Sequence, residues 1–257
     1  MIDIHSHLLP GVDDGSRSVD MSLPVMEQFV ADGVTCLVLT PHLTASRVAS
    51  APFQRNRAIF EELRSVAPQG LKLLLGWEIM LDEPNVDLRP RNLSLGGSNA
   101  VLVEFPLQGV PAQAGSELYR IRCSGVVPVL AHPERYYGCT VERVDEWRRA
   151  GAVIQMDTAG LLGRGPISKL SRALVQAGLV DLFSSDNHGD SRSLATARDW
   201  LLDVSTREHA DLLTCTTAMR LLKGEPMLPA PQLSAGVFAR LRELFLSRRS
   251  RSVSPSR

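Results

Sequence analysis

Residues 1–16, MIDIHSHLLPGVDDGS, join a short apolar run to two histidines one residue apart, followed by a turn with two aspartates and a glycine. The run MIDI is typical of a buried strand. Side chains two residues apart on a strand point to the same side, so His5 and His7 face the same way. On its own, this stretch is either a buried first strand with its turn or the first half of a metal site.

Short apolar runs recur along the chain, and helical patterns separate most of them. We expect strands at 1–4, 35–40, 71–76, 100–105, 126–131, 152–156 and 179–185. We expect helices at 21–32, 52–66, 116–124, 141–150, 167–177 and 194–204. Continuous apolar runs predict strands that are covered on both faces, and the alternation predicts a parallel sheet with helical crossovers. Because no linker interrupts the pattern, a single closed or nearly closed α/β barrel is favoured over two domains.

Three segments fall outside this alternation. Residues 82–98 hold turn formers with little periodicity, which predicts an extended loop. Residues 236–246, GVFARLRELFL, have helical spacing of apolar residues and are expected to dock on the barrel. Residues 247–257 are a polar tail expected to be disordered. The domain is therefore expected to span residues 1–246.

Composition limits the functional classes. The 257 residues carry 28 basic and 28 acidic side chains, so no positive field marks a nucleic-acid or membrane binder. No apolar stretch reaches the roughly 18 to 20 residues that span a bilayer. The four cysteines form no CxxC pair, and nothing at the start reads as a signal peptide. We expect a reduced, cytoplasmic protein whose four thiols are packing residues.

Metal-capable side chains occupy the carboxyl ends of six of the seven predicted strands. They are His5, His7, His42, Glu78, Glu104, His132, Asp186 and His188. In a parallel barrel these strand ends converge on one rim, where active sites of this architecture lie. A single histidine or glutamate at a strand end is more often a rim residue than a ligand. Five of the six histidines occupy such ends, however, and only His209 does not.

The residue types indicate the chemistry. Imidazole and carboxylate together suit Mn²⁺, Fe²⁺ or Zn²⁺, whereas an all-oxygen set would suit Mg²⁺ or Ca²⁺. The donors exceed what one ion can hold, so two or three ions are expected. Clustered ions share a bridging carboxylate and a water that becomes hydroxide near neutral pH, which points to metal-assisted hydrolysis.

These residues also carry a family likeness. The motifs are HSH at 5–7, DDG at 13–15, TPH at 40–42, GWE at 76–78, VEFP at 103–106, AHPERY at 131–136 and SSDNH at 184–188. From residue 1 to about residue 225, the chain resembles the PHP (polymerase and histidinol phosphatase) superfamily. More narrowly, it resembles the metal-dependent bacterial protein-tyrosine phosphatases encoded with capsule and exopolysaccharide genes.

The resemblance implies a distorted (β/α)₇ TIM-like barrel with a trinuclear site that prefers manganese, with Fe²⁺, Zn²⁺ and Mg²⁺ left open. One ion would be held by His5, His7, Glu78 and Asp186. Glu78 would bridge to a second ion held with Glu104 and His132. A third ion would be held by Asp14, His42 and His188. Asp14 is preferred over Asp13 because the superfamily pattern places its aspartate directly before the glycine, and Asp13 is left either as a residue supporting a ligand or as a turn residue.

The resemblance also implies catalytic residues and a substrate. Arg135 and Arg192 resemble the family's phosphate-binding pair, since a guanidinium group binds phosphoryl oxygens in a bidentate manner. We expect in-line attack of a metal-bridging hydroxide on phosphotyrosine, with His42 or His188 assisting the leaving group. The implied partner is the tyrosine-rich tail of a bacterial tyrosine autokinase that controls polysaccharide export. A homo-oligomer is left open, and Leu43 and Gly160 depart from the family pattern.

The same residues bear on two rival chemistries. A cysteine phosphatase needs C-x₅-R, and no cysteine of this chain has that arginine. Many amidohydrolases bridge their metals with a carbamylated lysine at the end of a middle strand, and no lysine has that position. Two alternatives remain. One is another metal-dependent phosphoesterase, acting on a small monoester such as histidinol phosphate or on a nucleic-acid end. The other is a non-catalytic scaffold stabilised by metal.

Overall fold

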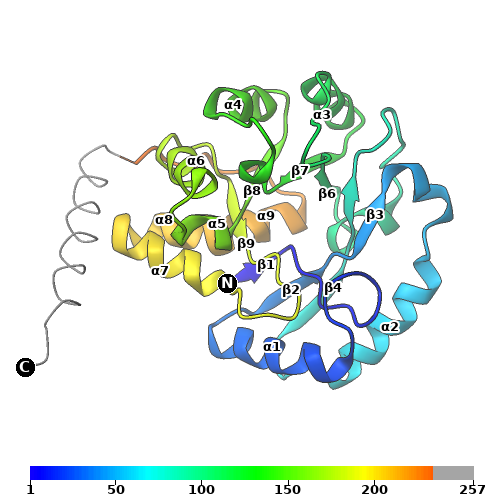
Figure 1. Ribbon diagram of the computed structural model, residues 1–257. Helices are drawn as coiled ribbons and strands as arrows, with labels where there is room; N and C mark the ends of the chain where they lie inside the picture. The colour runs from blue at the N-terminus through cyan, green and yellow to red at the C-terminus, as the bar shows by residue number, and fades with distance from the viewer. Residues whose placement is uncertain (234–257) are drawn as a thin grey trace, which may run out of the picture.

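The computed structural model describes residues 1–233, which form a mixed α/β structure with parallel strands. The strands are β1 (Ile2–Asp3), β2 (Cys36–Leu39), β3 (His42–Thr44), β4 (Lys72–Leu75), β5 (Glu78–Met80), β6 (Ala100–Glu104), β7 (Val127–Ala131), β8 (Val153–Asp157) and β9 (Leu182–Ser184). The longer helices are α1 (Val19–Ala31), α2 (Phe53–Val66), α3 (Ala114–Cys123), α4 (Val141–Arg149), α6 (Pro166–Gln176) and α7 (Leu194–Val204). The shorter ones are α5 (Thr158–Leu162), α8 (Arg207–Asp211), a π-helix η5 (Leu212–Thr216) and α9 (Thr217–Lys223). Helices lie around the strands in Figure 1.

All seven predicted strands are present, and two short strands were missed. β3 and β5 begin at His42 and Glu78, so these two residues start strands instead of following them. After Pro41 and Trp77 the chain stays extended, and β3 pairs in parallel with β5 with His42 opposite Glu78. The backbone pairing therefore sets the imidazole and the carboxylate side by side.

The strands form two parallel sheets, with the orders β1-β2-β4 and β3-β5-β6-β7-β8-β9. Gly76 N–H donates to Leu39 O at 2.9 Å, which extends the pairing of β2 with β4 inside the first sheet. Glu78 N–H donates to Pro41 O at 3.1 Å, which carries this pairing on to β3 and β5 of the second sheet. His7 N–H donates to Asn187 O at 2.8 Å, which links the segments that follow β1 and β9. Residues about 180 positions apart in the sequence therefore lie side by side.

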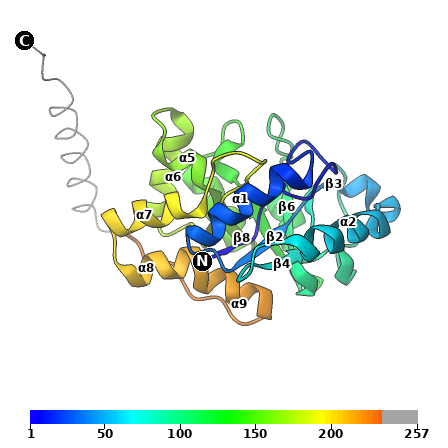
Figure 2. The ribbon, with the colours of Figure 1, turned by 90° about the horizontal axis from the view of Figure 1, so that it is seen from below.

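Both faces of the strands are buried, as the continuous apolar runs predicted. In β6, Val101 and Val103 pack in the core shared with α3, α4 and α7. Their neighbours Ala100 and Leu102 pack with the other strands and with α9. A third cluster joins α1 and α2 to β2 and β4, and Figure 2 shows these two helices across those strands. Packing on both faces holds the strand ends in fixed positions.

The expected helices formed, with shifts of a few residues at their ends. Short helices were missed at α5, α8, η5 and α9, because each has too few residues to show a clear period. The segment 82–98 is mostly loop, as expected, but contains two 3₁₀ turns, η2 (Arg91–Leu93) and η3 (Leu95–Gly97). The interpretations of residues 236–246 as a docked helix and of 247–257 as a disordered tail lie outside the described residues.

The four cysteines are free thiols, and Cys36 is buried. The expectation that all four are packing residues was wrong, because Cys123 is exposed. Cys123 ends α3 on the side that faces solvent.

Within residues 1–233, no helix combines the length and the apolar character needed to cross a membrane.

Candidate metal centre

The nine side chains expected as ligands come together where the chain leaves β1, β2, β4, β6, β7 and β9, and two of them, His42 and Glu78, begin β3 and β5. Within the described residues, four overlapping groups have donor atoms within 4.8 Å of one another. The groups are His7, Asp14, His42 and His188; His5, Glu78 and His132; His5, His7 and Asp186; and His42, Glu78 and Glu104. Every expected ligand occurs in at least one group, and no cysteine occurs in any group found there.

The two histidines of the opening stretch direct one nitrogen each at the same point. Nδ1 of His5 lies 3.1 Å from Gln155 Oε1, and Nδ1 of His7 lies 2.8 Å from Asp13 Oδ2. Both partners are acceptors, so each Nδ1 carries the proton and each Nε2 keeps its lone pair. The two Nε2 atoms are 3.1 Å apart and completely buried. Two lone pairs at this distance repel unless a cation or a proton lies between them.

Carboxylates surround the same point. Asp186 Oδ1 is 3.2 Å from Nε2 of both histidines, and Glu78 oxygens are 3.3 Å from each. Burial by itself lowers the pKa of His5, but the charges of Glu78 and Asp186 raise it to about 9. The pKa of Asp186 is lowered despite its burial, mainly by His5. Both shifts indicate a pocket that stabilises positive charge between its members.

Glu78 occupies the middle of the cluster. Its Oε1 is 2.8 Å from Nε2 of His132 and its Oε2 is 3.0 Å from Nδ1 of His42, in addition to its contacts with His5 and His7. The side chain is almost completely buried. Burial alone raises its pKa, but these histidines lower it well below the usual range, so the carboxylate stays ionised. A single carboxylate that touches four imidazoles has the position of a bridging ligand.

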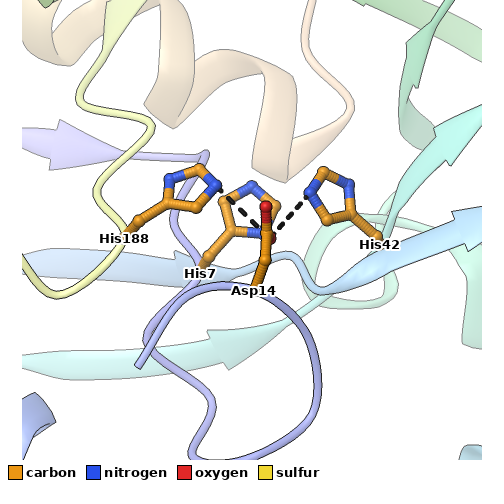
Figure 3. Close-up of side chains that lie close together, drawn as sticks. All are labelled: His7, Asp14, His42 and His188. Atoms are coloured by element: carbon orange, nitrogen blue, oxygen red, sulfur yellow. Dashed lines mark ion pairs between the residues drawn. The ribbon is translucent and has the colours of Figure 1, made fainter. Parts of the chain in front are cut away.

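A more exposed group lies over one side of the cluster. Asp14 Oδ1 is 3.2 Å from Nε2 of His42 and 3.6 Å from Nε2 of His188, and Figure 3 shows His7 pointing at the same place. The side chains of His42 and His188 are 40% and 22% exposed, whereas that of His7 is fully buried. This group faces the solvent side of the centre.

The donor groups do not coincide with the three ligand sets that the resemblance implies. Glu104 groups with His42 and Glu78, and His132 groups with His5 and Glu78. His7 also joins the group of Asp14, His42 and His188. The oxygens of Glu104 are 4.0 Å from Nδ1 of His42 and 3.9 Å from Nε2 of His132, so both imidazoles are within reach. Burial and the neighbouring Glu78 charge raise the pKa of Glu104.

The donor set fits a metal ion. Ligands about 2.1 Å from one ion lie roughly 3.0 to 3.4 Å from each other in octahedral and tetrahedral arrangements. The closest separations between the donors of His5, His7, Glu78 and Asp186 are 3.1 to 3.3 Å. Mixed imidazole and carboxylate donors suit Mn²⁺, Fe²⁺ and Zn²⁺.

Two of the expected ligands have a left-handed backbone. His132 has φ 32° and Asp186 has φ 47°, each directly or closely after a strand. Non-glycine residues in this region cost roughly 1 to 3 kcal/mol and persist where the surroundings over-determine them. Around Asp186, the backbone bond from its N–H to His5 O at 3.0 Å provides such a constraint. Strain is therefore concentrated at residues whose side chains meet in the cluster.

Several supporting residues complete the centre. Asp13, which the sequence left open, orients His7 and also accepts from the backbone N–H groups of Gly15 and His42 at 3.0 and 3.2 Å. Gln155 orients His5 in the same way, and sequence reasoning missed it. The available signal was a lone glutamine within an otherwise apolar strand. Partners of this kind set the tautomer and direction of a ligating imidazole.

A buried aspartate also ties β1 to the end of β9. Asp3 accepts from His5 N–H at 3.3 Å and from Ser185 N–H at 3.2 Å. Burial raises its pKa to about 6. This residue, also missed, holds two ligand-bearing segments together.

The two arginines singled out by sequence stand beside the cluster. Arg135 Nη1 donates to Asp186 Oδ2 at 2.7 Å, and Arg192 Nη1 approaches the same oxygen at 3.4 Å. Asp190 accepts from Arg192 Nε at 2.8 Å and holds this guanidinium in place. The two cations therefore converge on one carboxylate oxygen at the edge of the centre.

Comparison with known proteins places the chain in a family. Residues 1–223 match the family described as "Capsular polysaccharide synthesis, CpsB/CapC". The chain belongs to the CpsB/CapC family. The match covers β1 to α9 and therefore contains every residue of the candidate centre.

Named members of the CpsB/CapC family align over most of this chain. The tyrosine-protein phosphatase YwqE of Bacillus subtilis is 31% identical over 202 residues, covering 73% of this chain and 77% of YwqE. The tyrosine-protein phosphatase CpsB of Streptococcus agalactiae is 28% identical over 242 residues, covering 87% and 98%.

Solved structures agree with this assignment. A structure from work on YwqE of Bacillus subtilis and CpsB of Streptococcus pneumoniae, described as "unique metal-dependent tyrosine phosphatases", is 27% identical, has a TM-score of 0.71, and covers 91% of this chain and 99% of that one. A β-aspartyl dipeptidase from Fervidobacterium islandicum is 16% identical with a TM-score of 0.54, covering 91% of this chain and 76% of that one. The second match concerns the fold alone.

Glycine at position 15 is required by close packing against His7 in this CpsB/CapC-family site. A Cβ on Gly15 would overlap the carbonyl oxygen and the Cβ of His7. We expect Gly15→Ala to lower the free energy of unfolding by about 1 to 3 kcal/mol, because both neighbours are backbone or fully buried. Urea unfolding of the metal-free chain measures this change.

Gly109→Ala is the matched control for that substitution. Gly109 lies in a loop, has no left-handed backbone, and a Cβ there meets no other atom within 4 Å. We expect a change within about 0.5 kcal/mol for this variant. Equal stability of the two variants would show that the loop at residues 13–16 moves away from His7 at no cost.

Proposed function

We propose that this chain is a metal-dependent protein-tyrosine phosphatase that acts in capsule or exopolysaccharide synthesis. One observation carries the proposal: nine imidazole and carboxylate side chains converge at the strand ends with two arginines beside them. The named relatives of the CpsB/CapC family are tyrosine-protein phosphatases, and a solved relative is described as metal-dependent.

The proposed ligands form overlapping sets around two or three ions. His5, His7 and Asp186 would hold one ion, with Glu78 as the bridge to the next. The second ion would be held by Glu78 with His132 and Glu104, whose Nε2 and Oε2 atoms lie 3.9 Å apart, and the third by Asp14, His42 and His188. We propose Mn²⁺ as the resident ion, because imidazole with several carboxylates suits it. Bound ions would supply positive charge for a phosphoryl group and lower the pKa of water.

The arginines are proposed to bind the phosphoryl group. Arg135 and Arg192 already donate toward Asp186 Oδ2, so their guanidinium groups point at the centre before any substrate enters. A phosphoryl oxygen offers them a more highly charged acceptor than a carboxylate shared between two arginines. Because phosphoryl transfer depends mainly on positioning and charge, these two cations are the chain's main contribution beyond the ligands.

The tyrosine ring of the substrate is proposed to lie on the exposed side of the centre, and the tyrosine product is proposed to leave on that side. The cavity over the centre has a volume of about 260 Å³ and is also lined by Met80, Phe105 and Leu107, which offer apolar contact for a phenyl ring. Phenol has a pKa of about 10, so phenolate leaves with little help from an acid. Where the third ion is absent, His42 is the proposed proton donor, because it is the most exposed histidine of the cluster and Glu78 raises its pKa despite burial, with His188 as the alternative.

The strand arrangement is proposed to be a closed seven-stranded barrel of the PHP type. Two observations support it. β2 with β3, and β4 with β5, run on as paired extended segments, so nine short strands count as seven. The parallel bridge between Ser6 and Asn187 then joins the segment after β1 to the segment after β9.

The partner is proposed to be the phosphotyrosyl tail of a bacterial tyrosine kinase. The support is the capsule-synthesis family together with the tyrosine-phosphatase activity named for its members. Because tail phosphorylation needs ATP, this proposal places the reaction in the cytoplasm.

Phosphate release from a phosphotyrosyl peptide tests the activity. The full chain is stripped of metal, refilled with Mn²⁺, and compared on otherwise identical phosphotyrosyl and phosphoseryl peptides. We expect release that requires Mn²⁺ and is at least about tenfold slower from phosphoserine. Absence of release from both peptides while metal is bound would contradict the proposal and favour a small phosphate monoester or a non-catalytic scaffold.

A further inference from the structure

A second cavity opens directly beside the candidate centre. It has a volume of about 550 Å³ and shares His42, Met80 and Glu104 with the cavity over the centre. Its other walls come from residues 43–52, which include the 3₁₀ turn η1 (Ala45–Ser50). A chain segment attached to a group in the centre therefore has room on this side.

Arg47 is the cation of this second cavity. Its side chain is exposed, and within residues 1–233 its guanidinium group makes no hydrogen bond or ion pair. Arg135 and Arg192 differ, since both are paired with Asp186. Two hydroxyl-bearing residues, Thr44 and Ser50, line the same cavity. An unpaired guanidinium next to hydroxyl groups is suited to a carboxylate or a phosphate.

The turn that carries Arg47 is anchored on both sides. Asp82 accepts from Ser46 N–H at 3.0 Å and also from the Ser46 hydroxyl. At the other end, Ala51 N–H donates to Val48 O at 3.3 Å. The carboxylate of Asp82 is therefore occupied by Ser46. Within the described residues, no ion pair joins Asp82 to Arg47. These bonds fix the backbone around Arg47, and no carboxylate of the turn neutralises its guanidinium group.

The charge pattern of the lining favours an anion. Glu104 is the one carboxylate among the residues that line the second cavity, and it lies at the boundary with the centre. Under the proposed function its charge is taken up by a metal ion. Arg47 then dominates the electrostatic field of the remaining walls, whose other members, apart from the proposed ligand His42, are apolar or carry neutral hydroxyl groups.

We propose that this second cavity binds an anionic side chain of the substrate, close in sequence to the phosphotyrosine, with Arg47 as its ligand. The inference rests on the proposed function, because it takes the phosphotyrosine to occupy the centre. The anion is either a carboxylate of an acidic residue or a second phosphate, since both offer oxygen acceptors to a guanidinium group. Arg47 thus contributes to the choice of substrate sequence and leaves the reaction at phosphorus unchanged.

Matched peptides test this specificity. Each has one phosphotyrosine flanked on both sides by glutamate, phosphoserine, glutamine or lysine, and p-nitrophenyl phosphate serves as the substrate without flanks. For the Mn²⁺-loaded full chain we expect kcat/KM about three- to tenfold higher for glutamate than for glutamine flanks, the range of a partly exposed charged contact. A larger preference for phosphoserine flanks would identify phosphate as the natural anion, and a preference for glutamate would identify a carboxylate.

Variants separate a binding role from a structural one. Arg47→Ala should abolish the preference, and Arg47→Glu should reverse it toward lysine flanks, a change that misfolding cannot produce. Both should hydrolyse p-nitrophenyl phosphate at the wild-type rate. Arg149→Ala is the control, because Arg149 is an exposed arginine that lines a different cavity. Equal kcat/KM for all flanks in the wild-type chain would overturn the inference.

A binding measurement distinguishes a failure of the proposed function from a failure of the proposed role of Arg47. Fluorescence anisotropy with non-hydrolysable phosphonate versions of the same peptides reports the flank preference without turnover. No hydrolysis of any phosphotyrosine substrate would contradict the proposed function alone. Equal affinity for glutamate-flanked and glutamine-flanked phosphonates in both wild-type and Arg47→Ala proteins would contradict the role of Arg47 alone.

Discussion

Glu78→Gln is expected to reduce phosphate release from phosphotyrosine by about 1,000-fold or more and to lower the bound metal content. The side chain contacts four imidazoles with its two oxygens and is almost completely buried. An amide keeps the size of the side chain but removes the charge and one acceptor, so it cannot bridge two ions. A loss of this size corresponds to about 4 kcal/mol of transition-state stabilisation.

Metal analysis and kinetics measured together check this prediction. Content of Mn²⁺ per chain is determined after dialysis, beside kcat/KM on the phosphotyrosyl peptide. Glu83→Gln is the control, because Glu83 is an exposed carboxylate of the neighbouring loop. If Glu78→Gln keeps full metal content and more than a tenth of the activity, Glu78 is not a bridging ligand.

Arg135→Ala is expected to lower kcat/KM by about 100-fold while the metal stays bound. Arg135 touches the cluster through Asp186 Oδ2, and Asp186 keeps its contacts with His5 and His7 when the arginine is removed. The loss is therefore one of transition-state charge stabilisation, worth about 2.7 kcal/mol. Arg135→Lys should recover only part of it, because an ammonium group cannot form two parallel bonds to a phosphoryl group.

Steady-state kinetics and metal content together separate two roles of Arg135, which are binding of the phosphoryl group and positioning of Asp186. We expect Arg135→Ala to bind as much Mn²⁺ as the wild type, and Arg207→Ala, an exposed arginine of α8, to behave as wild type in both measurements. Parallel loss of metal and activity in Arg135→Ala would instead assign Arg135 to positioning Asp186.

Much of the fold was accessible from sequence. The seven strand positions were predicted because each is a short apolar run, and covered strands must be apolar on both faces. The shortest elements were missed for the opposite reason. β3 and β5 have three residues each, and their pairing depends on contacts between segments more than thirty residues apart, which no local pattern records.

In the candidate site, some residues were likewise predicted from the sequence and others were missed. Eight of the nine donors were predicted from their type and their position at strand ends, whereas Asp14 and the two arginines were predicted from the family resemblance. Their supporting partners were not, because Gln155 and Asp3 look like isolated polar residues in apolar strands and acquire a role only when His5 or Ser185 is placed beside them. The grouping of Glu104 with His42 likewise depends on how neighbouring strands are set against each other.

The sequence by itself determined the strand and helix order, the neutral charge balance, and the residue types that stand at the strand ends, because these depend on local composition and spacing. Only the tertiary structure decided which nitrogen of each histidine faces the centre and which donors share one gap. The physical reason is that the bond from Asp186 N–H to His5 O and the 3.1 Å approach of His5 and His7 arise from packing between distant segments. Hydrogen-bond partners such as Asp13 then select the tautomer that leaves a lone pair for a cation.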